Sequence, residues 1–128
     1  MSHQFEKHYT IDEANTLLPE IRDQLAEIRI VRDQLVANWE QAEPVLAAAP
    51  MNGGGSHAAN YVTDLSELSG HLRWFSRRGI LLKDIDRGLV DFPALREDRE
   101  VLLCWETAEE RVAFWHDLET GYAGREPW

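Results

Sequence analysis

The residues most able to do chemistry lie in the last third of the chain. Cys104 is the single cysteine of the sequence, and Asp91, Glu109 and His116 lie on either side of it. Zinc accepts mixed ligand sets of thiolate, imidazole and carboxylate. These four residues therefore form a candidate metal site, although no HExxH or CxxC spacing accompanies them.

The same side chains also have a simpler interpretation. A free cysteine is commonly a small buried apolar side chain, and a nearby aspartate and histidine can be held by ordinary hydrogen bonds. We favour packing over metal binding, because spacing alone does not count ligands. A catalytic role for Cys104 is the weaker hypothesis, since the thiol lies between Leu103 and Trp105 in the middle of an expected strand, where access is poor.

The turns between the expected strands decide which of these side chains are neighbours. If the second turn is centred on Glu97-Asp98, Asp91 faces Cys104 across the hairpin, with Cβ atoms roughly 5 Å apart. The preceding turn leaves two alternatives for the residue opposite Asp91. A two-residue loop places Asp84 there and forms an acidic row that suits a cation, whereas a three-residue loop with a glycine bulge places Lys83 there and forms a salt pair.

Arg125, near the end of the chain, is a candidate for a structural or an anion-binding role. Its guanidinium could bind an anion through two parallel hydrogen bonds. It could equally tie the tail to Asp84, Asp86 or Asp91. Because its surroundings are acidic, we expect the structural tie.

Two helical patterns precede these strands. The first helical region covers residues 10–42 and begins with a capping box formed by Thr10 and Glu13. Pro19 lies inside this region, so we expect it to kink the helix or to split off a short first helix.

The second helix is expected over residues 58–79, where Gly79 suits the left-handed residue that ends a helix. Two prolines and three consecutive glycines predict a flexible linker between the helices at residues 43–57. Two such helices joined by a loop form an antiparallel hairpin.

Short apolar runs separated by turns predict a meander of strands over residues 80–118. The segment 111–118 is ambiguous, because its β-branched and aromatic residues favour a strand while a Thr107–Glu110 box favours a helix. We expect a strand there, and a loop over residues 119–128. The predicted fold is α+β in a single domain: a long antiparallel helical hairpin plus a small three- to four-stranded antiparallel β-meander.

Several motifs of the C-terminal third occur in an order that resembles the bacterial domain of unknown function 2203 (DUF2203) family. They are Gly79-Ile80-Leu81-Leu82-Lys83-Asp84, Gly88-Leu89-Val90-Asp91-Phe92-Pro93-Ala94, Leu103-Cys104-Trp105, Trp115-His116 and Gly121-Tyr122-Ala123-Gly124-Arg125. The resemblance implies a bacterial, cytosolic protein and supplies no reaction. The family pattern has Asp-Gly where this chain has Glu97-Asp98, so we expect a wider turn there.

The composition bounds the class of protein. The 128 residues are 44% hydrophobic and 28% charged, as in soluble globular domains. A formal net charge of −10 opposes phosphate backbones and anionic lipid surfaces, so we expect neither a nucleic-acid nor a membrane partner. One cysteine excludes an intrachain disulfide, and no apolar run approaches the roughly 20 residues of a membrane helix. We therefore expect a cytoplasmic location.

Two functions of different classes follow from the sequence. The first is a non-enzymatic structural or interaction module that forms a homodimer through its helices, because Leu65, Leu68 and Leu72 form an apolar seam. The alternative is a metal-binding protein or metal-dependent enzyme built on Asp91, Cys104, Glu109 and His116. Whether the chain is an enzyme, and which cofactor it uses, stays open at this point.

Overall fold

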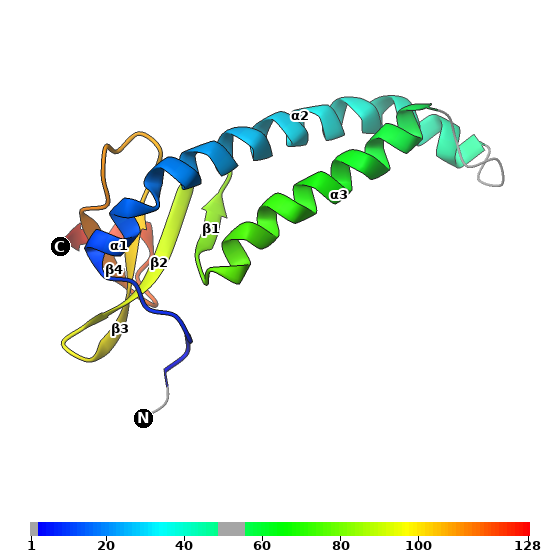
Figure 1. Ribbon diagram of the computed structural model, residues 1–128. Coiled ribbons are helices and arrows are strands. Elements are labelled where there is room, and N and C mark those ends of the chain that lie inside the picture. The colour runs from blue at the N-terminus through cyan, green and yellow to red at the C-terminus, as the bar shows by residue number, and fades with distance from the viewer. Residues whose placement is uncertain (1–2, 49–55) are drawn as a thin grey trace. The chain divides into compact units, whose positions relative to one another are not determined.

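The computed structural model describes residues 3–48 and 56–128, with side chains over residues 3–41 and 59–128. The helices are α1 (Ile11–Thr16), α2 (Leu18–Ala48) and α3 (Ser56–Arg77). The strands are β1 (Leu81–Asp84), β2 (Leu89–Arg96), β3 (Arg99–Trp105), β4 (Phe114–Asp117) and β5 (Glu126–Pro127), with a short 3₁₀ helix, η2 (Tyr122–Gly124), before β5 (Figure 1). The α+β class predicted from the sequence is confirmed.

The five strands form one antiparallel sheet in sequence order, β1-β2-β3-β4-β5. The prediction of three to four strands was wrong by one strand, and the tail over residues 119–128 is not simply a loop. β5 consists of two residues, which are too few to show the alternating pattern that predicts a strand. It forms because the outer edge of β4 pairs with it, and the Trp128 amide donates a hydrogen bond of 2.8 Å to the Ala113 carbonyl beside that edge. Within the ambiguous segment 111–118, residues Phe114–Asp117 form strand β4, so the expected strand is present but shorter.

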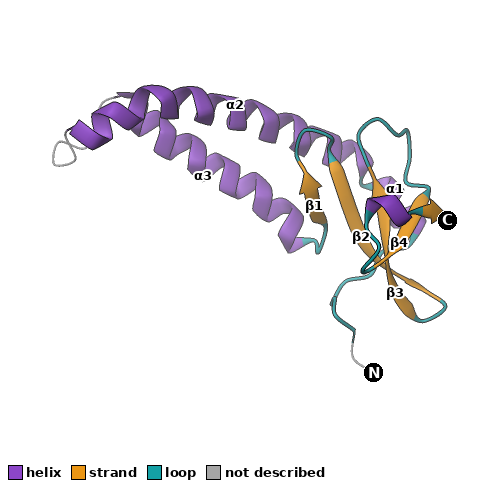
Figure 2. Ribbon diagram, turned by 180° about the vertical axis from the view of Figure 1, so that it is seen from behind, coloured by secondary structure: helices purple, strands orange, loops and turns teal. Residues whose placement is uncertain are grey.

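The chain divides into two compact units. Residues 1–25 together with 74–128 form the first unit, and residues 26–73 form the second. The first contains the sheet, α1 and the ends of the two long helices. The second contains α2 from residue 26 to its end and α3 up to residue 73, and these helices run antiparallel side by side (Figure 2). The sequence-based expectation of a single domain stays a prediction.

In the first unit, one face of the sheet forms the core. Val90, Phe92, Ala94, Val101, Leu103 and Trp105 alternate along β2 and β3 and are buried. Helix α1 and the start of α2 cover this face with Ala14, Leu18, Ile21 and Leu25, which are buried too. Alternation then directs the other side chains of β2 and β3 to the opposite face.

The helix boundaries follow local signals closely. Both halves of the capping box are present, since Thr10 Oγ1 accepts from the Glu13 amide and Glu13 Oε1 accepts from the Thr10 amide. Pro19 lies in the first turn of α2, where a proline needs no hydrogen-bond donor. The chain therefore splits into α1 and α2, as one of the two expectations for Pro19 stated.

The predicted linker at residues 43–57 was too long at both ends. Helix α2 continues through Ala48 and α3 already begins at Ser56. Pro44 lies inside α2, so this proline does not end the helix. The rest of the predicted linker lies outside the described residues.

In the second unit, α2 and α3 meet through polar and aromatic contacts. Asn38 Nδ2 donates a hydrogen bond of 2.7 Å to Asp64 Oδ2, and the rings of Trp39 and Tyr61 lie 5.2 Å apart. Leu65 and Leu72, two of the three leucines expected in a seam between two chains, are exposed in the single chain. The less exposed positions of α3 in this unit are Tyr61, Asp64, Leu68 and His71, which keep the three-four spacing of a heptad.

Among the described helices, none is both long and apolar enough to cross a membrane.

Two glycines allow a matched test of the prediction that Gly79 ends α3: Gly79 itself, just after the helix, and Gly70 inside it. Gly79 has a φ of +69°, and the hydrogen bonds from Gly79 N to Ser76 O and from Ile80 N to Phe75 O close the helix end. Gly79→Ala should destabilise the protein by about 1–2 kcal/mol, because an alanine is strained in the left-handed region.

Gly70 provides the control, because it is an exposed residue inside the same helix, and the nearest atom to an added Cβ is the flexible Arg73 Nη2 at 4.0 Å. Gly70→Ala should stabilise the protein by up to about 1 kcal/mol. Urea unfolding of both variants measures the two changes, and the same sign for both would contradict the assignment of Gly79 as the helix stop.

Candidate functional site

The site begins with the turn between β2 and β3. Glu97 and Asp98 both adopt positive φ, 53° and 65°, which makes the two-residue turn that matches the twist of a hairpin. The expectation of a wider turn was therefore wrong, because two acidic residues adopt the left-handed conformation without glycine. The resulting register places Asp91 opposite Cys104, which confirms the predicted pairing.

β4 brings the imidazole to the same face of the sheet. His116 pairs with Leu102, two residues before Cys104 on β3, and Phe114 pairs with Cys104 itself. Asp91, Cys104 and His116 thus come from three adjacent strands and point to the face opposite the helices. All three side chains are buried, with exposed fractions of 3%, 1% and 3%.

Both alternatives predicted for the residue opposite Asp91, Asp84 and Lys83, were wrong. The residue there is Leu81, because the register shifts at a bulge between Leu82 and Asp84. Asp84 pairs with Leu89, and its Oδ1 accepts a hydrogen bond of 2.9 Å from the Arg87 amide within the turn. Lys83 lies in the bulge and still lines the cavity above Asp91.

One donor atom from each of Asp91, Cys104 and His116 lies within 4.8 Å of the other two. His116 Nε2 and Asp91 Oδ2 are 3.3 Å apart. Asp91 Oδ1 is buried and has no hydrogen-bond partner among the described residues. A buried carboxylate oxygen without a partner is costly, so this oxygen is a ready acceptor or ligand atom.

The hydrogen bond on the far side of His116 fixes its tautomer. His116 Nδ1 lies 2.7 Å from the Asp117 carbonyl oxygen, which can only accept, so Nδ1 carries the proton and donates. In the neutral ring, Nε2 then presents its lone pair to Asp91 and Cys104. Metal-binding histidines are held in this way, with the second ring nitrogen donating to a carbonyl or carboxylate.

The electrostatics keep the thiol protonated in the absence of a cation. Burial raises the pKa of Cys104 to about 12, and the neighbouring Asp91 contributes to the rise while Arg125 opposes it. Burial also raises the pKa of Asp91, against the lowering effects of His116 and Cys104. A thiol with this pKa is a poor nucleophile near neutral pH, which argues against a catalytic cysteine.

Glu109 does not join the three donors. Its Oε1 accepts from the Glu106 amide at 3.0 Å, and its Oε2 is paired with the guanidinium of Arg125. Arg125 in turn reaches Cys104, with Nη1 at 3.8 Å from Sγ. Arg125 therefore ties the tail down as expected, but its partner is Glu109, so the assignment of Glu109 as a metal ligand finds no support in the geometry.

A cavity of about 260 Å³ opens above the three donors. Lys83, Glu119 and Tyr122 contribute to its wall, together with Asp91, Cys104 and His116 at its base. A metal held at this base by three protein ligands would keep one coordination position facing the cavity. That is the arrangement of catalytic rather than structural zinc sites.

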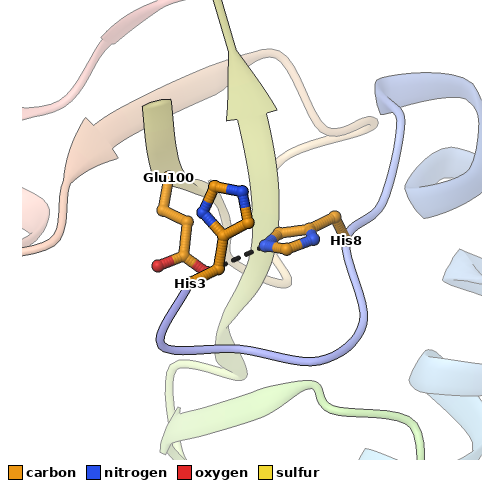
Figure 3. Close-up of side chains that lie close together, drawn as sticks. All are labelled: His3, His8 and Glu100. Carbon is orange, nitrogen blue, oxygen red and sulfur yellow. Dashed lines mark hydrogen bonds and ion pairs between the residues drawn. The ribbon is translucent and has the colours of Figure 1, made fainter. Parts of the chain in front are cut away.

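Sequence reasoning missed a second group of possible ligands. His3, His8 and Glu100 also place one donor atom each within 4.8 Å of the others (Figure 3). His8 and Glu100 are 92 residues apart, so no local spacing could have indicated this group.

The sequence model of the family described as Uncharacterized conserved protein (DUF2203) matches residues 7–128, and the chain belongs to this family. The resemblance noted in the sequence is thereby confirmed. No curated protein and no solved structure matches the chain. The description of the family assigns no ligand or reaction, so the role of the site follows from its geometry.

The protonated state of Cys104 can be measured by alkylation. At pH 8.5 an ordinary thiol is about half ionised, whereas a pKa of about 12 leaves roughly 1,000-fold less thiolate. Iodoacetamide should therefore modify the folded, metal-free protein at least about 100-fold more slowly than the same chain in urea. Equal rates in the two states would show that the thiol is neither buried nor held protonated.

Proposed function

We propose that this member of the DUF2203 family is a metal-binding protein that holds one Zn²⁺ ion through Asp91, Cys104 and His116. The observation that carries the proposal is the hydrogen bond from His116 Nδ1–H to the Asp117 carbonyl. In the neutral ring it leaves the lone pair on Nε2, which lies within 4.8 Å of donor atoms of a buried thiol and a buried carboxylate.

The distance between His116 and Asp91 supports a metal more than a direct ion pair. An imidazolium and a carboxylate in contact stand about 2.7–2.9 Å apart, whereas Nε2 and Oδ2 are 3.3 Å apart here. Two ligands that each lie about 2.0–2.1 Å from a tetrahedral ion are roughly 3.3–3.4 Å apart. The observed separation therefore fits two neighbouring ligands of one ion.

The charges support the same conclusion. A thiolate and a carboxylate together neutralise Zn²⁺, so the filled site would carry no net charge in its buried position. Without a cation, burial opposes ionisation of both groups, as the raised pKa values of Cys104 and Asp91 indicate. A bound metal deprotonates a ligating thiol outright, so zinc would relieve this conflict.

The function that follows is binding or activation of a small molecule at the open position of the ion. The cavity supplies the room, and Lys83 places a cationic side chain on its wall. A zinc ion held by these residues would act as a Lewis acid towards a molecule at its open position. The metal would supply this chemistry, while the chain would orient the ion and exclude bulk water from it.

Substitution of the three ligands tests the site. Cys104→Ala, His116→Ala and Asp91→Asn should each remove one tightly bound equivalent of zinc, with an affinity loss of at least about 100-fold, because each removes a direct ligand. Titration calorimetry on protein stripped with a chelator measures both numbers. Zinc should raise the unfolding temperature of the wild type and of Glu109→Gln, a comparison variant that weakens the Arg125 pair and keeps all three proposed ligands.

The pH dependence provides the check on mechanism. Cys104 is protonated at pH 7.5, so zinc binding should release its proton, and the affinity should rise with pH. Undiminished zinc binding by Cys104→Ala, or binding without proton release, would contradict the proposal.

A homodimer formed through the helices is the second candidate function. The supporting observation is an apolar stripe on α3 within the second unit: Val62, Leu65 and Leu72 have exposed fractions of 65%, 47% and 39%. Val36 and Trp39 on α2 are exposed as well. Two hairpins could cover these residues by packing into a four-helix bundle.

Light scattering tests this second candidate. The wild type should have twice the chain mass of 14.7 kDa at micromolar concentration. Leu65→Glu should shift it to a monomer, because a charge would be buried in the interface, whereas Ser66→Glu on the next exposed position should not. A wild type that stays monomeric on concentration would exclude the dimer.

A further inference from the structure

The geometry points to a second site for a divalent transition-metal ion, formed by His3, His8 and Glu100 and distinct from the site at Asp91, Cys104 and His116. It lies where the N-terminal segment folds back onto β3 (Figure 3). Its donor set is two imidazole nitrogens and one carboxylate oxygen, all within 4.8 Å of one another.

Backbone hydrogen bonds hold the N-terminal segment in this position at two places. The amides of Gln4 and Phe5 donate to the two carboxylate oxygens of Glu100, at 2.7 and 2.9 Å. The Tyr9 amide donates to the Pro93 carbonyl at 2.7 Å. The chain between these anchors turns back on itself, and it carries His3 and His8 to the same side of Glu100.

The two imidazoles differ in their contacts. His8 Nε2 lies 2.8 Å from Glu100 Oε2, and both side chains are partly buried. The His3 ring stands edge-on to the His8 ring, with centroids 5.1 Å apart. In the part of the chain that the structure describes, the ring nitrogens of His3 have no hydrogen-bond partner, so His3 is the donor left free for a ligand.

An ion pair between His8 and Glu100 alone would account for only part of this arrangement. It explains the 2.8 Å contact but gives no role to His3, which is exposed and yet lies against the pair. A metal would use all three side chains, and His8 Nε2 and Glu100 Oε2 would have to separate from their direct 2.8 Å contact to admit it. The amides of Gln4 and Phe5 would then orient the ligating carboxylate, as the outer hydrogen bonds of metal sites commonly do.

The donor set selects the class of ion. Two imidazoles and one carboxylate suit Zn²⁺, Co²⁺ or Fe²⁺, whereas Mg²⁺ and Ca²⁺ prefer oxygen ligands alone. Because His3 is exposed, water would complete the coordination and the affinity should be lower than at the buried site. A bound ion would join residues 3–8 to β3 and so order the N-terminal segment.

This second site depends on a residue outside the part of the chain that the family model matches. The match covers residues 7–128, which includes His8 and Glu100 but not His3. The inference is therefore about this chain and does not rest on the proposed function of the buried site.

Counting bound zinc in the full-length protein tests the proposal, with zinc chloride as the probe. His3→Ala should lower the zinc bound by one equivalent, or weaken the weaker class of sites at least about 10-fold. Its unfolding temperature without metal should be unchanged, since the His8–Glu100 contact and both amide hydrogen bonds remain. Gln4→Ala is the matched control, because it keeps the backbone amide and should bind zinc as the wild type does.

The two metal sites are separated in the same experiment. Cys104→Ala should retain the equivalent that His3→Ala removes, and Mg²⁺ at the same concentration should not compete for it. If His3→Ala binds zinc with the stoichiometry and affinities of the wild type, the second site is wrong, whatever Cys104→Ala shows. If only Cys104→Ala retains wild-type binding, the buried site is wrong and the second site stands.

Discussion

The register of the β2–β3 hairpin is the constraint on which the rest of the structure depends. Glu97 and Asp98 take positive φ and close the tightest turn a hairpin allows, so the opposing residues are fixed from that point onward. A slip of one residue would turn every side chain to the other face. Asp91 and Cys104 would then enter the core beneath the helices, and the residues that form that core would face the cavity. Burial of the apolar side chains on one face of the sheet therefore fixes the positions of Asp91 and Cys104 on the other face.

The polar face of the sheet brings together a carboxyl group and a thiol whose ionised forms a bound cation would stabilise. Asp91 and Cys104 both resist ionisation in their buried positions, while the His116 tautomer presents a lone pair to them. Arg125 approaches the thiol from the tail but is itself paired with Glu109. Lys83 is a further cationic side chain that lines the cavity beside the three donor residues. The remaining open side of the site is the cavity, which is where an ion and its exchangeable ligand would fit.

The features predicted correctly from the sequence are those decided within a single turn or hairpin. Thr10 and Gly79 define helix ends through their own backbone geometry, and one turn sufficed to pair Asp91 with Cys104. Some errors are local, namely the turn at Glu97-Asp98 and the bulge at Lys83, and the others concern contacts that form only when distant segments meet. A bulge at Lys83 changed the β1–β2 register without any signal in the turn, and β5 exists only because β4 offers an edge. The Glu109–Arg125 pair and the group of His3, His8 and Glu100 were not predicted for the same reason, because their members are far apart in the sequence.

The central claim is that three adjacent strands hold one metal ion through sulfur, nitrogen and oxygen. X-ray absorption at the zinc edge tests it most directly, on His3→Ala protein loaded with one equivalent so that only the buried site is filled. The account predicts one sulfur at about 2.3 Å and the remaining nitrogen and oxygen ligands at about 2.0–2.1 Å. A first shell without sulfur, or zinc that spreads among surface carboxylates with no ordered second shell, would contradict it.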